Sequence, residues 1–317
     1  MDSTAVAEKK ADWGLAVRAF SFPASIVPVV LGGVLAWYAT GKFNWILFIL
    51  SILAGVFYHC GCNLINDYYD HRKGVDREGA YGGSGVLVSG AMEPAQVMRG
   101  AITFFALGSL IGFFFLYHFH TSTETPWPFG WPLLAIGVAG LIGAVWYTSG
   151  DVSAKYNALG IPLVFLMMGT LMVVGGWFIQ TGTLDWLPVI VSLPVGFMVA
   201  AILQANDIRD IDDDRQAGVK TLSNLTGPRA ARQQYYFMLF APYVCVVIFA
   251  AFGLISWFGL LPLVTLPLAI PLAKLFASTP ETDSEKLHPS IENTAKLHMA
   301  FGMLLTIGLV IGKLTGM

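Results

Sequence analysis

Long apolar stretches recur along the whole chain, and short polar segments separate them. Each stretch holds about 20 residues, which is the length that a helix needs to cross a hydrocarbon core of ~30 Å. Because lipid offers no partner to backbone N–H and C=O groups, each stretch is predicted to be an α-helix. The pattern predicts nine spans, at about residues 22–40, 44–65, 97–118, 131–148, 158–178, 186–205, 235–254, 257–276 and 296–315.

Prolines subdivide this pattern. Proline lacks a backbone N–H and clashes with the preceding turn, so it begins, ends or kinks a helix. We expect one of these effects at Pro23, Pro28, Pro162, Pro188, Pro194, Pro262, Pro267 and Pro271.

Composition agrees with a membrane protein. Of the 317 residues, 56% are hydrophobic and only 12% are charged, and the mean hydropathy is +0.66. Soluble domains carry about twice that share of charged residues. No polar segment is long enough to fold alone. We therefore predict an all-α integral membrane protein with one domain over residues 1–317.

The basic residues indicate an orientation. With nine spans, sixteen of the eighteen Lys and Arg residues lie on the N-terminal side of the membrane, and only Lys42 and Lys313 lie opposite. By the positive-inside rule, the N-terminus is then cytoplasmic and the C-terminus is outside. An even number of spans would scramble this segregation. We expect a multi-pass protein of the inner (cytoplasmic) membrane.

The first twenty residues differ from the spans. They mix charges and lack the apolar core and cleavage site of a signal peptide. We expect residues 1–20 to form a short interfacial segment, with Trp13 and Phe20 as anchors at the membrane surface.

The cysteines do not indicate a disulfide framework. Cys60, Cys62 and Cys245 all fall within apolar stretches, and their number is odd. We expect them to act as small hydrophobic side chains.

Acidic residues gather in two segments that resemble each other. Residues 63–76 read NLINDYYDHRKGVD and residues 206–220 read NDIRDIDDDRQAGVK, and together they hold eight (three plus five) of the twenty acidic residues. The segments follow the second and sixth spans, and this equal spacing of four spans suggests an internal duplication. For any single acidic residue here, the simpler interpretation is that it lies in a loop and faces water.

Helical spacing weakens that simpler interpretation. Asn63, Asn66 and Asp70 fall at i, i+3 and i+7, which is one face of a helix that Gly74 would end. In the second segment, the same argument places Asn206, Asp210 and Asp214 on one face. Asp207 lies on a neighbouring strip, and Asp212 and Asp213 are expected to face water.

Carboxylates that share a face repel one another, so such an arrangement favours a shared cation. Oxygen ligands without His or Cys indicate a hard ion, Mg²⁺ or Mn²⁺. Mg²⁺ usually leaves coordination positions for substrate phosphates. Two such clusters that face each other would hold a diphosphate between them.

Basic residues accompany the acids on the same side of the membrane. They could bind phosphate and stabilise a leaving group, although positive-inside topology alone could also place them there. Lys155 is the only basic residue of its loop, WYTSGDVSAKYNALG. The candidates for diphosphate binding are Arg72, Lys73, Lys155, Arg209, Arg215 and Lys220.

The stretch AYGGSGVLVSG at residues 80–90 is rich in glycine but lacks the GK[ST] ending of a phosphate-binding P-loop. A flexible loop over a site would have this composition. We assign it no specific chemistry.

With these motifs in place, the chain resembles the UbiA superfamily of intramembrane prenyltransferases. NDYYDHRKGVD and NDIRDIDDDRQAGVKTL are similar to that family's two aspartate-rich motifs, and WGLAVRAFSFPASIVPVVLGG and YTSGDVSAKYNALG are similar to its first span and middle loop. Among the branches, the motifs most resemble MenA, which prenylates 1,4-dihydroxy-2-naphthoate on the route to menaquinone. The chain departs from MenA at Gly85, where an arginine is usual, and at residues 159–162 (LGIP), where GLGE is usual.

This resemblance implies a fold and a mechanism. The fold is a bundle of nine helices around a central cavity, with a cytoplasmic polar cap. Two Mg²⁺ ions, for which Mn²⁺ can substitute, would bridge the diphosphate of a polyprenyl donor, and the allylic cation would be attacked by an aromatic acceptor. One ion would be held by Asn66, Asp70 and either Asp67 or Asp76, and the other by Asn206, Asp210 and Asp214. Asp70, Asp210 and Lys155 are the expected catalytic residues.

The departures lie near the expected acceptor site, so other acceptors stay open: 4-hydroxybenzoate, homogentisate or a lipid alcohol. The lipid bilayer is an expected partner, and nucleic acid is not. A transporter is a rival interpretation, but it predicts acids at mid-span, where this chain has essentially none. A CDP-alcohol phosphotransferase would carry D-G-x-x-A-R, which is absent.

Overall fold

The computed structural model describes residues 11–77, 79, 82–122, 125–150 and 152–316. Within these residues the secondary structure is helical, apart from one isolated β-bridge between Asn157 and Lys220. The predicted all-α class is therefore confirmed.

Nine helical stretches of the described chain are long and apolar enough to cross a membrane, as the hydrophobic pattern predicts. Several consist of two or more consecutive elements. The stretches are Ala19–Thr40 (η1 and α2), Trp45–Arg72 (α3), Pro94–Thr121 (α4), Pro128–Thr148 (η2 and α5), Gly160–Thr181 (α6, η3 and α7), Leu187–Arg209 (α8 and α9), Pro228–Ala251 (α12), Trp257–Ser278 (η4 and α13) and Ser284–Thr315 (η5 and α14).

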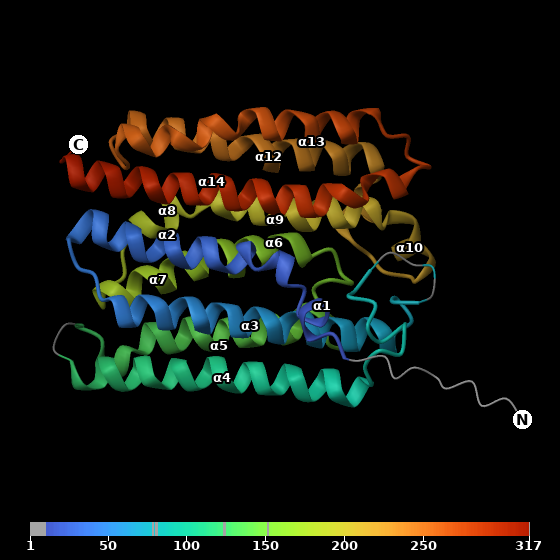
Figure 1. Cartoon of the computed structure of the whole chain (residues 1–317), viewed down its shortest axis with the longest axis horizontal. Coiled ribbons are helices and arrows are strands. Elements are labelled where there is room, and N and C mark those ends of the chain that lie inside the picture. The colour runs from blue at the N-terminus through green and yellow to red at the C-terminus, as the bar shows by residue number, and fades with distance from the viewer. Residues whose placement is uncertain (1–10, 78, 80–81, 123–124, 151, 317) are drawn as a thin grey trace, which may run out of the picture.

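The long helices run side by side along the longest axis of the molecule (Figure 1). The short helices α1 (Trp13–Ala16) and α10 (Ile211–Gln216) both lie toward one end of the bundle, as do the polar connections after α3 and α9. The C-terminal end of α14 (His288–Thr315) lies at the other end. The two acidic segments therefore occupy the same end of the bundle.

Two spans are longer than their apolar runs. The second was predicted to end near residue 65, but α3 continues to Arg72. The last was predicted to begin near residue 296, but its helical stretch begins at Ser284. In both cases the extra turns carry polar side chains, so hydrophobicity alone marks only the part of the helix that suits lipid.

Prolines act mostly at helix starts. Pro23, Pro188, Pro194 and Pro267 lie in the first turn of α2, α8 (Leu187–Val191), α9 (Leu193–Arg209) and α13 (Leu266–Ser278), where a missing N–H has no helical partner to lose. Pro162 lies in α6 (Gly160–Val164), directly before the π-helical η3 (Phe165–Leu171). Pro262 lies in the 3₁₀ segment η4 (Trp257–Thr265). Pro28 and Pro271 lie inside α2 and α13, where the helix continues around them.

Glycines let α2 (Pro23–Thr40) and α7 (Met172–Thr181) pack with their backbones in contact. A Cβ at Gly32 would lie 2.2 Å from the carbonyl oxygen of Val173, and one at Gly176 would lie 2.7 Å from that of Val29. Small residues at such contacts are typical of helix pairs in lipid, where close packing replaces the hydrophobic drive of water. This pair forms part of a buried core that continues into α9, α12, α13 and α14.

The N-terminal segment is described from residue 11, so the predicted interfacial segment over residues 1–20 lies partly outside the described residues. Asp12 caps α1 by accepting a hydrogen bond from the Leu15 N–H at 3.0 Å. Trp13 and Phe20 are 44% and 50% exposed, as anchors at a membrane surface would be. The three cysteines are free, as predicted.

Candidate functional site

The first acidic segment lies at the end of α3. Because the helix reaches Arg72, Asn63, Asn66 and Asp70 share one face, as their spacing predicts. Gly74 follows the helix with a φ of 70°, a left-handed conformation that glycine adopts without strain. Asn66, Asp67 and Asp70 are all buried.

Asp70 is bound from its own helix and from the loop before α6. Asn66 Nδ2 donates to Asp70 Oδ2 at 2.9 Å, and Lys155 Nζ donates to the same oxygen at 2.5 Å. Tyr156 donates its hydroxyl to the other carboxylate oxygen. Burial opposes the charge on Lys155, but Asp70, with Tyr147 and Tyr156, raises the pKa of the lysine well above its usual range. Lys155 is therefore a fixed positive charge at Asp70.

Asp67 is bound by residues from two other segments. Arg18 forms an ion pair with Oδ1, and the Ser84 backbone N–H donates to Oδ2 at 3.0 Å. Arg18 has a φ of 52°, an uncommon conformation for a residue with a side chain. Burial opposes its charge, yet Asp67, Asp76 and Asp70 raise the pKa of the guanidinium.

The second acidic segment spans a break between two helices. α9 ends at Arg209 and α10 begins at Ile211, but the Asp210 N–H still donates to the Asn206 carbonyl at 3.0 Å and the Asp214 N–H to the Asp210 carbonyl at 2.8 Å. The helical phase therefore persists through the break. Asp210 and Asp214 are buried, whereas the Asp212 side chain is 62% exposed.

Asp210 is held by its neighbours in sequence. Arg209 donates to both carboxylate oxygens, from Nε to Oδ1 at 2.5 Å and from Nη2 to Oδ2 at 2.7 Å. Asn206 Nδ2 donates to Asp210 Oδ2 at 3.1 Å. Burial raises the pKa of Asp210, although the Arg209 guanidinium opposes this shift.

Both acidic segments face one central cavity of about 560 Å³. An ion pair of 3.2 Å also joins Arg77, the residue after the first segment, to Asp213 of the second. The polar end of the cavity is lined by Arg18, Asn66, Asp70, Asp76, Tyr147, Lys155, Asn206, Asp207, Asp210 and Asp214.

Below this polar end, the cavity is apolar and rich in glycine. Its walls include Gly137 and Gly140 of α5 (Trp131–Thr148), and a Cβ at either position would meet no atom within 4 Å. The lining also includes Phe113 and Leu134, which are 65% and 47% exposed. The wall of the apolar part of the cavity is therefore built in part from exposed apolar side chains of α4 (Pro94–Thr121) and α5.

The carboxylates at the polar end are in excess of the cations that they contact. Burial, and next the charge of Asp70, raises the pKa of Asp76 to about 7. Burial, and then the charges of Asp210 and Asp70, raises the pKa of Asp214 to about 7 against the opposing charge of Lys155. Asp76 Oδ1 is buried without a hydrogen-bond partner among the described residues. The polar end of the cavity therefore favours the binding of additional positive charge.

In the described part of the chain, no three His, Cys, Asp or Glu side chains converge closely enough to hold a metal by themselves. The oxygen donors are instead mixed, because each segment pairs an asparagine amide with an aspartate: Asn66 with Asp70, and Asn206 with Asp210. This donor set suits Mg²⁺ or Mn²⁺ that completes its coordination with substrate oxygens.

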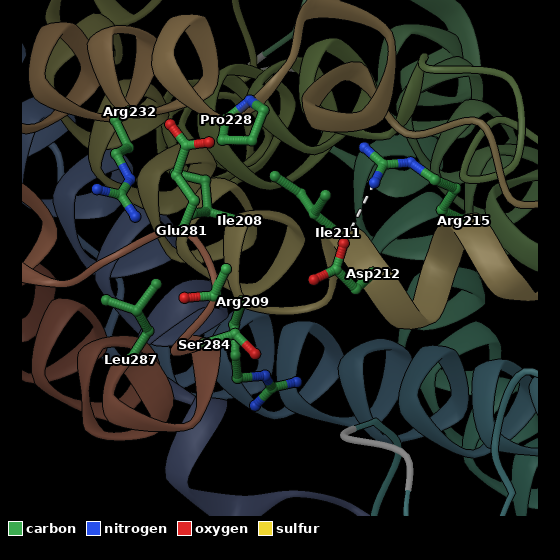
Figure 2. A pocket seen from close by; sticks show the side chains of 11 residues that line it. Ile208, Arg209, Ile211, Asp212, Arg215, Pro228, Arg232, Glu281, Ser284 and Leu287 are labelled. Carbon is green, nitrogen blue, oxygen red and sulfur yellow. Dashed lines mark hydrogen bonds and ion pairs between the residues drawn. The ribbon is translucent and has the colours of Figure 1, made fainter.

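Of the basic residues that the sequence suggested, Lys155 alone lines the central cavity. Arg72 and Lys73 are exposed, and Lys73 Nζ donates to the Gly150 carbonyl at 2.5 Å. Lys220 is exposed, beside Asn157. Arg209 and Arg215 line a separate cavity of about 200 Å³ on the outer side of α9 and α10, where Arg215 pairs with Asp212 at 3.2 Å (Figure 2).

Four residues at the polar end were not among the sequence candidates for site roles: Arg18, Tyr147, Tyr156 and Asp207. Arg18, Tyr147 and Asp207 line the cavity, and Tyr156 contacts Asp70. Tyr156 follows Lys155 in the sequence, so the loop that made Lys155 a candidate also offered a signal for Tyr156. Asp207 was placed on a neighbouring strip, and only the packing of α9 shows that this strip also faces the cavity.

Comparison with known proteins connects this site with one family. The sequence model of the UbiA prenyltransferase family matches residues 25–304. "UbiA prenyltransferase domain-containing protein 1" of Homo sapiens is 33% identical over 304 residues, which cover 96% of this chain and 85% of that protein. Its homolog in Drosophila melanogaster is 35% identical over 298 residues, covering 92% and 77%.

Two solved structures share the fold. A UbiA homolog from Aeropyrum pernix K1 superposes with a TM-score of 0.62 at 18% identity, covering 93% of this chain and 98% of that one. A UbiA homolog from Archaeoglobus fulgidus bound to GPP and Mg²⁺ gives 0.59 at 15% identity, covering 92% and 99%. At these identities the likeness concerns the fold.

Proposed function

Because this chain belongs to the UbiA prenyltransferase family and is a prenyltransferase, we propose that it transfers a polyprenyl group from a polyprenyl diphosphate to an aromatic acceptor. The observation that carries the proposal is the central cavity, which joins a polar end with two acid–amide pairs to an apolar remainder. A diphosphate suits the first part and an isoprenoid chain the second.

We assign metal ions to these acidic residues because the buried carboxylates are in excess of the cations that they contact. Asn66, Asp70 and either Asp67 or Asp76 would hold one ion, and Asn206, Asp210 and Asp214 the other. Asp76 is the stronger candidate of its pair, because Asp67 is already bound by Arg18 and Ser84, whereas Asp76 Oδ1 has no hydrogen-bond partner among the described residues. When bound, Mg²⁺ or Mn²⁺ would neutralise the diphosphate charge that develops as the leaving group departs.

The protein's own groups have three tasks in this reaction. Lys155 and Arg18, both fixed as cations and both lining the cavity, orient the diphosphate and stabilise its negative charge. The apolar wall holds the chain so that its first carbon lies beside the acceptor. The same wall keeps water from the allylic cation, which would otherwise be hydrolysed. The C–O bond breaks with its electron pair on the diphosphate, and an aromatic carbon forms the new bond.

For the six basic residues of the cap, we propose different roles according to their positions. Lys155 would contact the diphosphate directly, whereas Arg209 would act through Asp210, to which it donates two hydrogen bonds. Lys73 lies near the polar end of the cavity, because its Nζ is 3.9 Å from the centre of the Tyr156 ring. Arg72, Arg215 and Lys220 are exposed, so their contribution would be to attract an anionic substrate to this end of the bundle.

For the acceptor, the motifs favour 1,4-dihydroxy-2-naphthoate and a role in menaquinone biosynthesis. 4-Hydroxybenzoate, homogentisate and a lipid alcohol are alternatives, and one protein of similar fold is named as a digeranylgeranylglyceryl phosphate synthase. The test offers purified protein, with Mg²⁺ and a labelled polyprenyl diphosphate, a panel of these four acceptor classes and identifies products by mass. A prenylated naphthoate is expected. No adduct with any aromatic acceptor would refute the proposed function.

Donor length should depend on the glycine wall. Gly140→Leu should reduce transfer from long polyprenyl diphosphates on the order of tenfold relative to geranyl diphosphate, because the leucine occupies open space beside the chain. Gly140→Ala is the matched control, since its Cβ meets no atom within 4 Å. Competition between the two donors in one reaction measures the ratio. An equal loss for both donors would place the chain elsewhere.

The orientation that we propose puts the polar cap in the cytoplasm, as the positive-inside rule predicts. A membrane-impermeant thiol probe should label Lys286→Cys from the cytoplasmic side only and Lys42→Cys from the opposite side only. Both positions are exposed at opposite ends of the bundle. The parent protein should give no signal, because its cysteines lie within spans. Labelling of both variants from one side would contradict the nine-span topology.

A further inference from the structure

The two acidic segments repeat one short pattern, but the second residue of that pattern has different contacts in each. NDYYD at residues 66–70 and NDIRD at residues 206–210 both read N-D-x-x-D, so Asp207 is the counterpart of Asp67. Asp67 is bound within the protein through an ion pair with Arg18. By contrast, no hydrogen bond or ion pair joins the carboxyl group of Asp207 to another described residue.

Asp207 is nevertheless buried, and it faces the central cavity. The residue is only 7% exposed, and it belongs to the lining of the cavity. A buried polar group without a hydrogen-bond partner costs free energy, so nearly all such groups in folded proteins are satisfied. Because no described residue satisfies this carboxyl group, it is available to a molecule that binds in the cavity.

Asp207 lies at the boundary between the polar and the apolar parts of the cavity. It precedes Asp210 by three residues on α9, which places it about 4.5 Å deeper in the bundle at 1.5 Å per residue. Deeper still, the cavity wall of α9 is apolar, with Leu203 and Val199 one and two turns further on. A diphosphate at the acids and an isoprenoid chain in the apolar part would therefore meet near the level of Asp207.

An aromatic side chain lies beside this part of α9. Tyr147, near the end of α5, lines the same cavity. A Cβ at Gly160 would lie 3.5 Å from the Tyr147 ring and 3.6 Å from the Leu203 side chain, so these two side chains converge on one glycine. Leu203 is one helical turn from Asp207. The carboxyl group and the ring therefore border the same region of the cavity, from two different helices.

Asp207 does not join its neighbouring acids in one metal site. Asp207, Asp210 and Asp214 fall at i, i+3 and i+7, a spacing that lets side chains share a helical face. Yet in the described part of the chain no three such side chains converge closely enough to hold a metal. The ion proposed above takes Asn206, Asp210 and Asp214, which leaves Asp207 for a different ligand.

The chemistry of the two substrates indicates which ligand this is. A carboxylate repels a diphosphate, and an isoprenoid chain has no hydrogen-bond donor. The acceptor carries a hydroxyl group, which can donate to a carboxylate. We propose that Asp207 binds the acceptor by accepting a hydrogen bond from this hydroxyl group, with the acceptor ring against Tyr147. This inference rests on the proposed function, because it names the acceptor subsite of the same cavity.

The test compares Asp207→Leu, Asp207→Asn and Asp212→Asn in steady-state kinetics with 1,4-dihydroxy-2-naphthoate, geranyl diphosphate and Mg²⁺. Asp207→Leu should raise the acceptor KM on the order of tenfold or more, because a hydrogen bond is lost, and leave the donor KM and the half-saturating Mg²⁺ concentration within about twofold. Asp207→Asn keeps one carbonyl oxygen, so its acceptor KM should lie between those of the parent and Asp207→Leu. Asp212→Asn is the control, because it removes an acid that is exposed and does not line the central cavity.

Methylation of the acceptor gives a readout that needs no variant. Of the two mono-methyl ethers of the naphthoate, the one that lacks the contacted hydroxyl should have a kcat/KM on the order of tenfold lower with the parent enzyme. In Asp207→Leu, the same methylation should change kcat/KM little, because the partner of the hydroxyl group is gone.

Three results would overturn the assignment of Asp207 while the parent enzyme is active. One is equal use of both ethers and the unmodified acceptor by the parent, which applies even where Asp207→Leu fails to fold. Another is an acceptor KM in Asp207→Leu that matches Asp212→Asn. The third is a raised Mg²⁺ requirement in Asp207→Leu, which would make Asp207 a metal ligand. A parent enzyme that prenylates no aromatic compound would instead overturn the proposed function itself.

Discussion

Removal of divalent cations should reduce prenyl transfer to background, and Mg²⁺ or Mn²⁺ should restore it. The reason lies in the electrostatics of the polar end, where burial and mutual repulsion raise the pKa values of Asp76 and Asp214 to about 7. A diphosphate adds further negative charge to this end. Lys155 and Arg18 alone do not balance it, because each is already engaged by an aspartate.

The measurement is product formation in excess EDTA, followed by titration with single metals. Zn²⁺ should restore activity poorly, because neither cluster offers His or Cys ligands. Melting of the protein in EDTA serves as the control, since a folded, inactive protein separates loss of chemistry from loss of structure. Full turnover in chelator would refute the assignment of the two acid–amide groups to metal.

The sequence predicted the elements of this fold well because lipid imposes a simple rule. Any apolar stretch that crosses the membrane must be helical, and the nine predicted spans all appear as helical stretches. The face shared by Asn66 and Asp70 was also predictable, because helical spacing is local. Boundaries were less certain, since polar turns extend α3 and α14 beyond the apolar runs.

Partners from distant segments could not be predicted. Arg18 reaches Asp67 across 49 positions of sequence, and Lys155 reaches Asp70 across 85. Charge and membrane side placed both cations at the correct end of the bundle but did not distinguish them from Arg72 or Lys220, which are exposed. Which basic residues reach the cavity depends on how the loops fold over it, and the hydrophobic pattern contains no information about that folding.

Asp210→Asn and Asp214→Asn should each lower turnover on the order of 10²-fold or more, which is the scale of losing one preorganised charge-stabilising group. Both carboxylates are buried and line the central cavity. Their helical phase continues from Asn206 through the break between α9 and α10, so all three side chains are directed at the same volume.

Asp212→Asn and Asp213→Asn are the matched controls, because they lie in α10 beside Asp210 and Asp214 and change the net charge equally. Asp212 pairs with Arg215 on the outer side of α10, and Asp213 pairs with Arg77 (Figure 2 shows the first pair). The Asp212–Arg215 pair is exposed, and exposed ion pairs contribute little. Asp213 is 24% exposed but lines neither cavity, so both variants should keep turnover within a few-fold of the parent. The four variants are compared at equal amounts of folded protein in the membrane. Equal losses in all four would mean that net charge at the cap, rather than a metal site on one helical face, controls the reaction. Full activity in Asp210→Asn and Asp214→Asn would place the second metal elsewhere, and the two-ion diphosphate site would then be wrong.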